Sequence, residues 1–88
     1  MKSRATRRFW SCFESFLPSI QTLARKNYLL WLKNSHHPSL HFKKLSGSET
    51  RFSIRVGDRY RAVGQTTGDG VEWVWIGSHE EYNKLLNR

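Results

Sequence analysis

Apolar residues recur at helical spacing in the first third of the chain. Over residues 4–17 they are separated by one or three positions, which places them on one broad helical face. A second set follows the same period over residues 19–33. Pro18 stands between the two sets, where it would end the first helix and open the second. The pattern therefore predicts two antiparallel helices joined by a short loop, a helical hairpin.

The pattern changes to strand-like alternation after residues 34–39, which we interpret as a loop because Pro38 disfavours helical geometry at His37. Apolar and polar residues then alternate, and Gly57-Asp58 is a tight hairpin signal between two alternating runs. The last run is apolar on both faces apart from Glu72, so we place it inside the sheet. The predicted strands form a four-stranded meander over residues 41–45, 51–56, 59–65 and 71–76.

A short helix is predicted at the end of the chain. Ser78 and Glu81 have the spacing of a capping box, in which the two side chains satisfy backbone N–H groups at a helix start. The predicted fold class is therefore α+β, with an N-terminal helical hairpin packed on a small twisted antiparallel sheet and a short C-terminal helix. The 88 residues suffice for a single small domain over residues 1–88.

The charge of the chain gives the first functional indication. Lys and Arg number 15 against 7 Asp and Glu, a net charge of +8, which attracts polyanions. Binding to nucleic acid or the ribosome is one interpretation. The other is a basic surface that keeps the protein soluble or meets an acidic partner.

The sequence gives no indication of a disulfide, a metal site, a membrane span or a signal peptide. Cys12 is the single cysteine, so it cannot form a disulfide within the chain, and His36, His37 and His41 have no Cys or acidic residue at metal-ligand spacing. We interpret these histidines as loop residues that are candidates to touch RNA. The apolar runs are too short for a membrane span, and no signal peptide is recognised. We expect a cytoplasmic protein with no metal, no cofactor and no membrane partner.

Basic residues gather on the predicted second and third strands. Alternation places Arg51 and Arg55 on the polar face of one strand and Arg59 and Arg61 on one face of its partner. Hairpin pairing would join them in one patch suited to phosphate, because the planar guanidinium binds two oxygens at once. Lys43 and Lys44 on the preceding strand would extend this RNA-binding patch. The alternative is an ordinary solvated sheet face.

His79 is the strongest single candidate for chemistry. It follows a strand and stands at the start of the last helix, where backbone N–H groups suit an anion. An imidazole can donate or accept a proton near neutral pH. The alternative is a surface histidine at a helix terminus.

Three segments in the second half together resemble the RelE/ParE toxin superfamily, closest to its ParE-like or RelE-like branch. They are His37-Pro38-Ser39-Leu40 with the residues up to 45, the run from Phe52-Ser53-Ile54-Arg55 to Tyr60-Arg61-Ala62, and Trp75-Ile76-Gly77-Ser78-His79 up to Tyr82. With the helical hairpin, the resemblance covers nearly the whole chain. It implies a toxin of a type II toxin–antitoxin pair whose cognate antitoxin carries an acidic segment.

The resemblance implies two activities of different classes. RelE-like members are endoribonucleases that cut mRNA in the ribosomal A site by attack of a ribose 2′-OH on the adjacent phosphate, without a metal or cofactor. ParE-like members inhibit DNA gyrase and are not nucleases. A third alternative is an inactive homologue that keeps only the antitoxin contact. The implied partners are thus the ribosome and mRNA, or DNA gyrase.

The resemblance also assigns roles to single residues. Arg55 and Arg61 correspond to phosphate-binding positions, His79 to the catalytic histidine, and Tyr82 to a terminal aromatic of some members. Ser53 stands where some family ribonucleases have a basic residue, which favours the non-nuclease alternatives. Family members usually begin with a strand, whereas residues 1–3 are too few for a full one, so we expect an open sheet edge that a partner covers.

Overall fold

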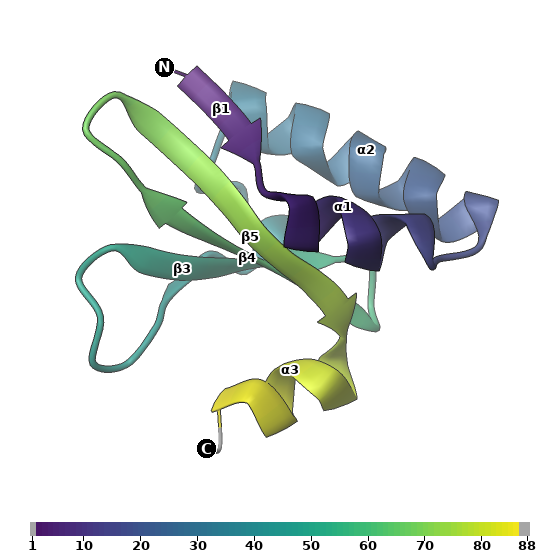
Figure 1. The fold of residues 1–88 in the computed structure, drawn as a ribbon. Coiled ribbons are helices and arrows are strands. Elements are labelled where there is room, and N and C mark those ends of the chain that lie inside the picture. The colour runs from purple at the N-terminus through teal and green to yellow at the C-terminus, as the bar shows by residue number, and fades with distance from the viewer. Residues whose placement is uncertain (1, 87–88) are drawn as a thin grey trace.

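The computed structural model describes residues 2–86 and has the predicted α+β architecture (Figure 1). A strand at the start precedes two helices, a 3₁₀ turn, a run of antiparallel strands and a last helix. The elements are β1 Lys2–Ala5, α1 Arg7–Glu14, α2 Pro18–Lys33, the 3₁₀ turn Pro38–Leu40, β2 Lys43–Lys44, β3 Arg51–Val56, β4 Tyr60–Thr66, β5 Gly70–Ser78 and α3 His79–Leu86.

The strands form one five-stranded sheet in the order β1-β5-β4-β3-β2. Neighbours from β2 to β5 are antiparallel, which confirms the predicted meander, and β5 lies inside the sheet as expected. β1 pairs with β5 in parallel, so the sheet is mixed rather than purely antiparallel. β1 therefore covers the edge of β5 that was expected to be open.

The prediction that the N-terminus lacks a full strand is wrong for the described residues; Met1 lies outside them. Lys2–Ala5 is a strand although its pattern is mostly polar, because pairing through the backbone to β5 needs no apolar alternation. Thr6 then ends the strand: its N–H donates to the Trp73 carbonyl at 2.9 Å, and its Oγ1 accepts from the Phe9 N–H at 3.2 Å. This side-chain cap starts α1 at Arg7 instead of residue 4.

The two sides of the sheet carry different layers. Helices α1 and α2 cover one face, as Figure 1 shows, and the main core fills the space between them. α3 lies against the other face, where Val63, Trp75 and Tyr82 form a second buried cluster. A bulge between Val63 and Gly64 shifts the pairing of β4 with β5. The side of the sheet that carries α3 is called the α3 face below.

Two local features position the residues at one end of the α3 face: the cap of α3 and the turn between β3 and β4. The capping box is confirmed: the Ser78 N–H donates to Glu81 Oε1 at 3.1 Å, and the Glu81 N–H donates to Ser78 Oγ at 3.1 Å. The hairpin between β3 and β4 has a longer turn than predicted, since Val56 pairs with Tyr60. Arg59 thus lies in the turn, and the alternation that grouped it with Arg61 does not extend to it.

None of the helices described over residues 2–86 has the length and apolar character that crossing a membrane requires.

Candidate functional site

The two arginines of the β3–β4 hairpin lie side by side on the α3 face. Arg55 and Arg61 are direct partners in the antiparallel register, and directly opposed residues project from the same side of a sheet. Both are half-buried. Gly77 is the partner of Arg61 on β5, and the Trp75 ring occupies the space that a side chain at Gly77 would fill. The hairpin therefore brings two guanidinium groups together, as alternation predicted.

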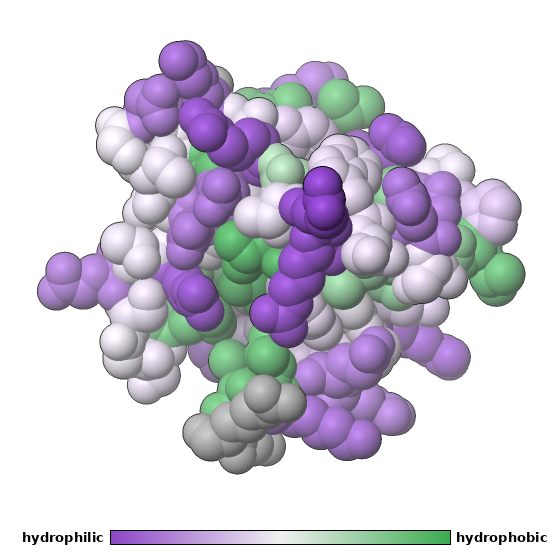
Figure 2. Space-filling view, viewed as in Figure 1, coloured by the Kyte–Doolittle hydropathy of each residue, from purple (hydrophilic) through white to green (hydrophobic). Residues whose placement is uncertain are grey.

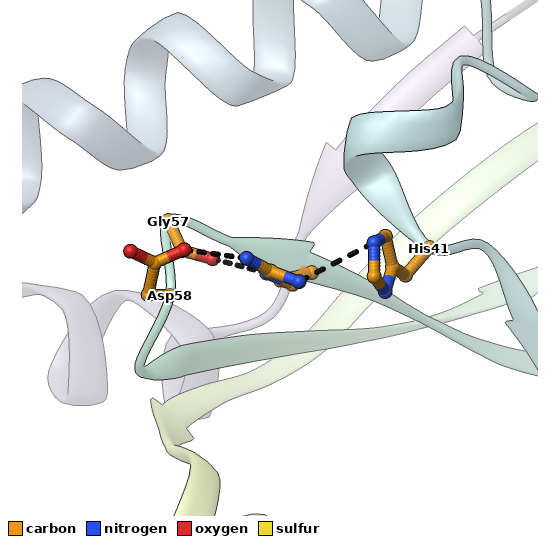
Figure 3. A network of polar contacts seen from close by, with 4 residues as sticks. His41, Gly57 and Asp58 are labelled. Atoms are coloured by element: carbon orange, nitrogen blue, oxygen red, sulfur yellow. Dashed lines mark hydrogen bonds and ion pairs between the residues drawn. The ribbon is translucent and has the colours of Figure 1, made fainter.

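Arg55 is fixed by several contacts, shown in Figure 3. Its Nε donates to the Gly57 carbonyl at 2.7 Å, its Nη2 bonds to Asp58 Oδ1, and its Nη1 lies 3.3 Å from His41 Nε2. Because arginine has no acceptor, His41 Nε2 is the acceptor in that contact. Arg55 is thus held in one orientation, and part of its charge is balanced by Asp58.

Arg61 has a different environment, made of neutral groups. Its Nη1 lies 3.4 Å from the His41 carbonyl oxygen and 3.4 Å from Ser53 Oγ. Its guanidinium carbon lies over the ring of Tyr82, 5.4 Å from the centroid. In the part of the chain that the structure describes, the ion pairs are Lys2–Asp69 and Arg55–Asp58, so Arg61 has no carboxylate partner there. Its charge is available to an anion.

Ser53 and Tyr82 support Arg61 from within the protein. Ser53 is 0% exposed and Tyr82 is 4% exposed, and the two hydroxyl oxygens lie 3.0 Å apart. The position where some family ribonucleases have a basic residue thus holds a buried serine. The pair forms a polar support that joins β3 to α3 under the arginine.

His79 lies at the first residue of α3 and is exposed. Its backbone N–H donates to the Arg59 carbonyl at 2.7 Å, which ties the helix start to the β3–β4 turn. Its ring is near-parallel to that of Tyr82, with centroids 6.3 Å apart. His79 and Arg61 therefore both lie against the Tyr82 ring, which places the predicted imidazole in the same region as the arginines.

The remaining predicted basic residues are distributed more widely. Lys43 pairs with Ser53 and so lies on the α3 face, whereas Lys44 pairs with Phe52 on the opposite face. Arg51 lies on the α3 face at the far end of β3, beside a groove lined by Leu45, Val63, Trp75 and Leu85. Figure 2 shows apolar surface between hydrophilic side chains in this lower half of the view, near α3.

His41 contacts both arginines, a role that sequence reasoning missed. The sequence groups His41 with His36 and His37 as loop residues and predicts no contact between it and the arginines. The strand predicted over residues 41–45 is limited to Lys43–Lys44, and His41 precedes it with a left-handed backbone, so strand alternation did not place its side chain.

The remaining cavity and the remaining polar residues of the described chain do not form a second candidate site. A cavity of about 200 Å³ lies on the opposite side of the sheet, between the helices and strands, and its lining is mostly apolar and includes none of the predicted site residues. Within residues 2–86, no three His, Cys, Asp or Glu side chains come together in a way that would hold a metal ion.

Comparison with known proteins gives the family. The model of the ParE-like toxin domain matches residues 18–84, which include Arg55, Arg61, His79 and Tyr82. No curated protein matches the sequence.

Solved structures share the fold at low identity. The YoeB/ParE toxin from Agrobacterium tumefaciens has a TM-score of 0.72 at 18% identity, over 90% of this chain and 99% of that one. The DinJ-YafQ toxin-antitoxin complex of E. coli gives 0.70 at 13%, over 91% and 93%. The RelB-RelE antitoxin-toxin complex from Methanococcus jannaschii gives 0.69 at 16%, over 90% and 93%. The fold, the matched range and the motifs agree, and the chain belongs to the family of ParE-like toxin domains.

Proposed function

We propose that this toxin inhibits translation as a ribosome-dependent endoribonuclease of mRNA. The observation that carries the proposal is the environment of Arg61, a half-buried cation held by neutral acceptors beside a second arginine. Such a preorganised pair suits a phosphodiester, whose charge grows in the transition state of cleavage. The proposal implies a protein that acts in the cytoplasm.

The chemistry assigned to the site is attack of a ribose 2′-oxygen on the adjacent phosphorus. The 2′-hydroxyl gives its proton to solvent water, and the new P–O bond forms as the bond to the 5′-oxygen breaks. The products are a 2′,3′-cyclic phosphate and a 5′-hydroxyl. Arg61 and the N–H groups of Arg55 that remain free bind the phosphate oxygens. His79 transfers the proton that the leaving 5′-oxygen needs. Tyr82 acts through its ring, by positioning Arg61 and His79.

The other basic residues have a less direct part in this proposal. Lys43 and Arg51 lie on the α3 face and would contact phosphates of the RNA backbone on either side of the scissile phosphate. Arg59 is exposed in the turn that holds the start of α3, and Lys44 is exposed at the sheet edge. Both would add long-range attraction for RNA rather than contacts to the reacting group.

Inhibition of DNA gyrase is the second candidate, and one observation favours it. Ser53 is fully buried and hydrogen-bonded to Tyr82, so its position supplies no cation to a phosphate. The matched family is also the ParE-like one. In this alternative the arginines would bind a protein or DNA surface, and His79 would have no chemical role.

A cognate antitoxin with an acidic segment is the proposed partner. Two of the solved relatives are toxin–antitoxin complexes, and the net charge of +8 suits an acidic chain that folds on binding. Co-expression with the product of a neighbouring acidic reading frame tests this directly. Co-purification supports the proposal, and toxicity that the product does not relieve contradicts it.

One paired assay separates the two activities. Purified protein is added to translating ribosomes, with primer extension on the mRNA, and in parallel to gyrase, with a DNA-supercoiling readout. The nuclease proposal predicts new mRNA ends that His79→Ala removes, and normal supercoiling. Loss of supercoiling with intact mRNA, unchanged by His79→Ala, would assign the toxin to gyrase instead.

A further inference from the structure

His41 lies between the two arginines and touches each with a different part of the same residue. Its imidazole Nε2 lies 3.3 Å from Arg55 Nη1, and its carbonyl oxygen lies 3.4 Å from Arg61 Nη1. Figure 3 shows the ring beside the guanidinium of Arg55, opposite Gly57 and Asp58. The residue thereby links the cation of β3 to the cation of β4.

The backbone at His41 makes this double contact possible. Its φ of 46° is left-handed, and among residues 2–86 it is the one non-glycine residue with a positive φ. This conformation is uncommon for residues other than glycine, although Asn, Asp and His adopt it more readily than most. An observed backbone outlier of this kind is a reason to look for a functional constraint.

The preceding turn holds His41 in place. The His41 N–H donates to the Pro38 carbonyl at 3.2 Å and closes the 3₁₀ turn, and Leu40 is 0% exposed. The anchor is therefore apolar and fixed, while His41 itself remains exposed. The turn therefore fixes the backbone of His41, and the imidazole reaches Arg55 from this fixed position.

The neighbouring histidines show what an ordinary loop histidine does here. His36 packs its ring against Phe42, with centroids 5.2 Å apart. His37 accepts from the Ser39 N–H at 3.2 Å through Nδ1, a local cap. Neither contact involves Arg55 or Arg61, so His41 differs from them in its partners.

We propose that His41 is a positioning residue that sets the orientation of Arg55 and Arg61 toward one phosphate, an inference that rests on the proposed nuclease function. Its ring fixes the Arg55 guanidinium from the side opposite Asp58. Its carbonyl fixes Arg61 on the other strand. Each guanidinium then presents its remaining N–H groups to the substrate.

The contact with Arg55 can be tested without any activity. Because Nε2 accepts from arginine, the neutral ring carries its proton on Nδ1. A long-range ¹H–¹⁵N spectrum of the wild-type protein should show His41 with unprotonated Nε2, and Arg55→Ala should remove that preference. A ring protonated on Nε2 in the wild type, or a tautomer indifferent to Arg55→Ala, overturns the proposed contact.

The functional role needs variants that keep the turn. His41→Asn and His41→Gly both tolerate a positive φ and keep the carbonyl for Arg61, but neither can reach Arg55 as the imidazole does. His36→Asn is the matched control. We expect both His41 variants to cleave ribosome-bound mRNA about tenfold more slowly at saturating ribosomes, with KM changed by less than about threefold, because orientation rather than charge is lost.

The outcomes distinguish this inference from the function on which it rests. Folding of each variant is checked by its melting temperature and by the ¹H–¹⁵N spectrum. Cleavage by the His41 variants at the wild-type rate overturns the positioning role and leaves the nuclease function intact. A wild-type protein that leaves mRNA uncut overturns the nuclease function and the role of His41 in it, while the tautomer still reports whether the contact exists.

Discussion

Arg61 lies over the ring of Tyr82, with the guanidinium carbon 5.4 Å from the ring centroid. The ring faces the cation, and the hydroxyl turns inward to Ser53 at 3.0 Å. A cation above an aromatic face is stabilised by the ring quadrupole. The ring of Tyr82 therefore contacts Arg61 while its hydroxyl contacts Ser53, and substitutions can separate the two contacts.

Tyr82→Phe should keep the ring under Arg61 and lose the bond to Ser53. We expect a fall of about 1 kcal/mol in the free energy of unfolding, because Ser53 Oγ stays buried with one partner fewer, and mRNA cleavage close to wild type. Tyr82→Leu should lose both the bond and the cation–π contact and should reduce cleavage as well. Denaturant unfolding and primer extension measure the two effects.

Tyr60→Phe is the control for these Tyr82 variants, since the Tyr60 ring packs on Phe16 in the other layer. If Tyr82→Phe abolishes cleavage while the protein stays folded, the hydroxyl acts directly in the reaction. That result would contradict the proposal that Tyr82 acts only through its ring.

Gly70→Ala should displace β1. A Cβ at Gly70 would overlap the backbone oxygen of Lys2, and backbone atoms cannot move aside as a flexible side chain does. We expect a loss of about 1–3 kcal/mol of stability by denaturant unfolding, with faster amide exchange in β1 and β5. Gly68→Ala, in the same turn with open space around it, is the control. Equal stability of both variants would mean that β1 does not pair as described.

Ser78→Ala should weaken the start of α3. The Ser78 hydroxyl accepts from the Glu81 N–H and donates to the Glu81 carboxylate, so its loss leaves the first turn uncapped. A fall of about 1 kcal/mol in unfolding free energy is expected, together with faster amide exchange over the first turn and slower cleavage, because His79 is in that turn. Ser11→Ala, exposed in α1, should change neither quantity. Unchanged exchange in α3 would argue against the capping role.

Asp58→Asn should strengthen binding of single-stranded RNA. The Asp58 carboxylate is 86% exposed and balances part of the Arg55 charge, while Gly57 and His41 still hold the arginine without it. An increase in affinity of about threefold is expected at low salt, shrinking as salt rises, with little change in stability. Asp69→Asn removes the same charge at the opposite end of the hairpin strands. If both variants bind RNA equally, the effect is one of net charge and the Arg55 region is not the site.

Much of the fold follows from local patterns. The helical period predicted α2, alternation predicted β3 and most of β4, and the Ser78–Glu81 spacing predicted the start of α3. Alternation with the hairpin signal also predicted that Arg55 and Arg61 share one face. These features depend on residues close in sequence, which is why composition and period are sufficient for them.

The features that the sequence did not predict depend on distant contacts or unusual backbone. β1 is stabilised by pairing with a strand some 70 residues away, so its own polar pattern carries little signal. The turn between β3 and β4 is longer than predicted and includes Arg59, and the alternation of apolar and polar residues does not indicate where a turn ends. His41 reaches both arginines through a left-handed backbone, a conformation that a strand pattern does not anticipate.

The most direct test of the account compares Arg61→Gln with Arg25→Gln on mRNA in programmed ribosomes, read by primer extension. Both changes remove one guanidinium, but Arg25 is exposed on α2, in the layer on the opposite side of the sheet. We expect Arg61→Gln to lower the cleavage rate by about 100-fold or more and Arg25→Gln to cleave at a rate near that of the wild type. Equal cleavage by the two variants, with both folded, would contradict it.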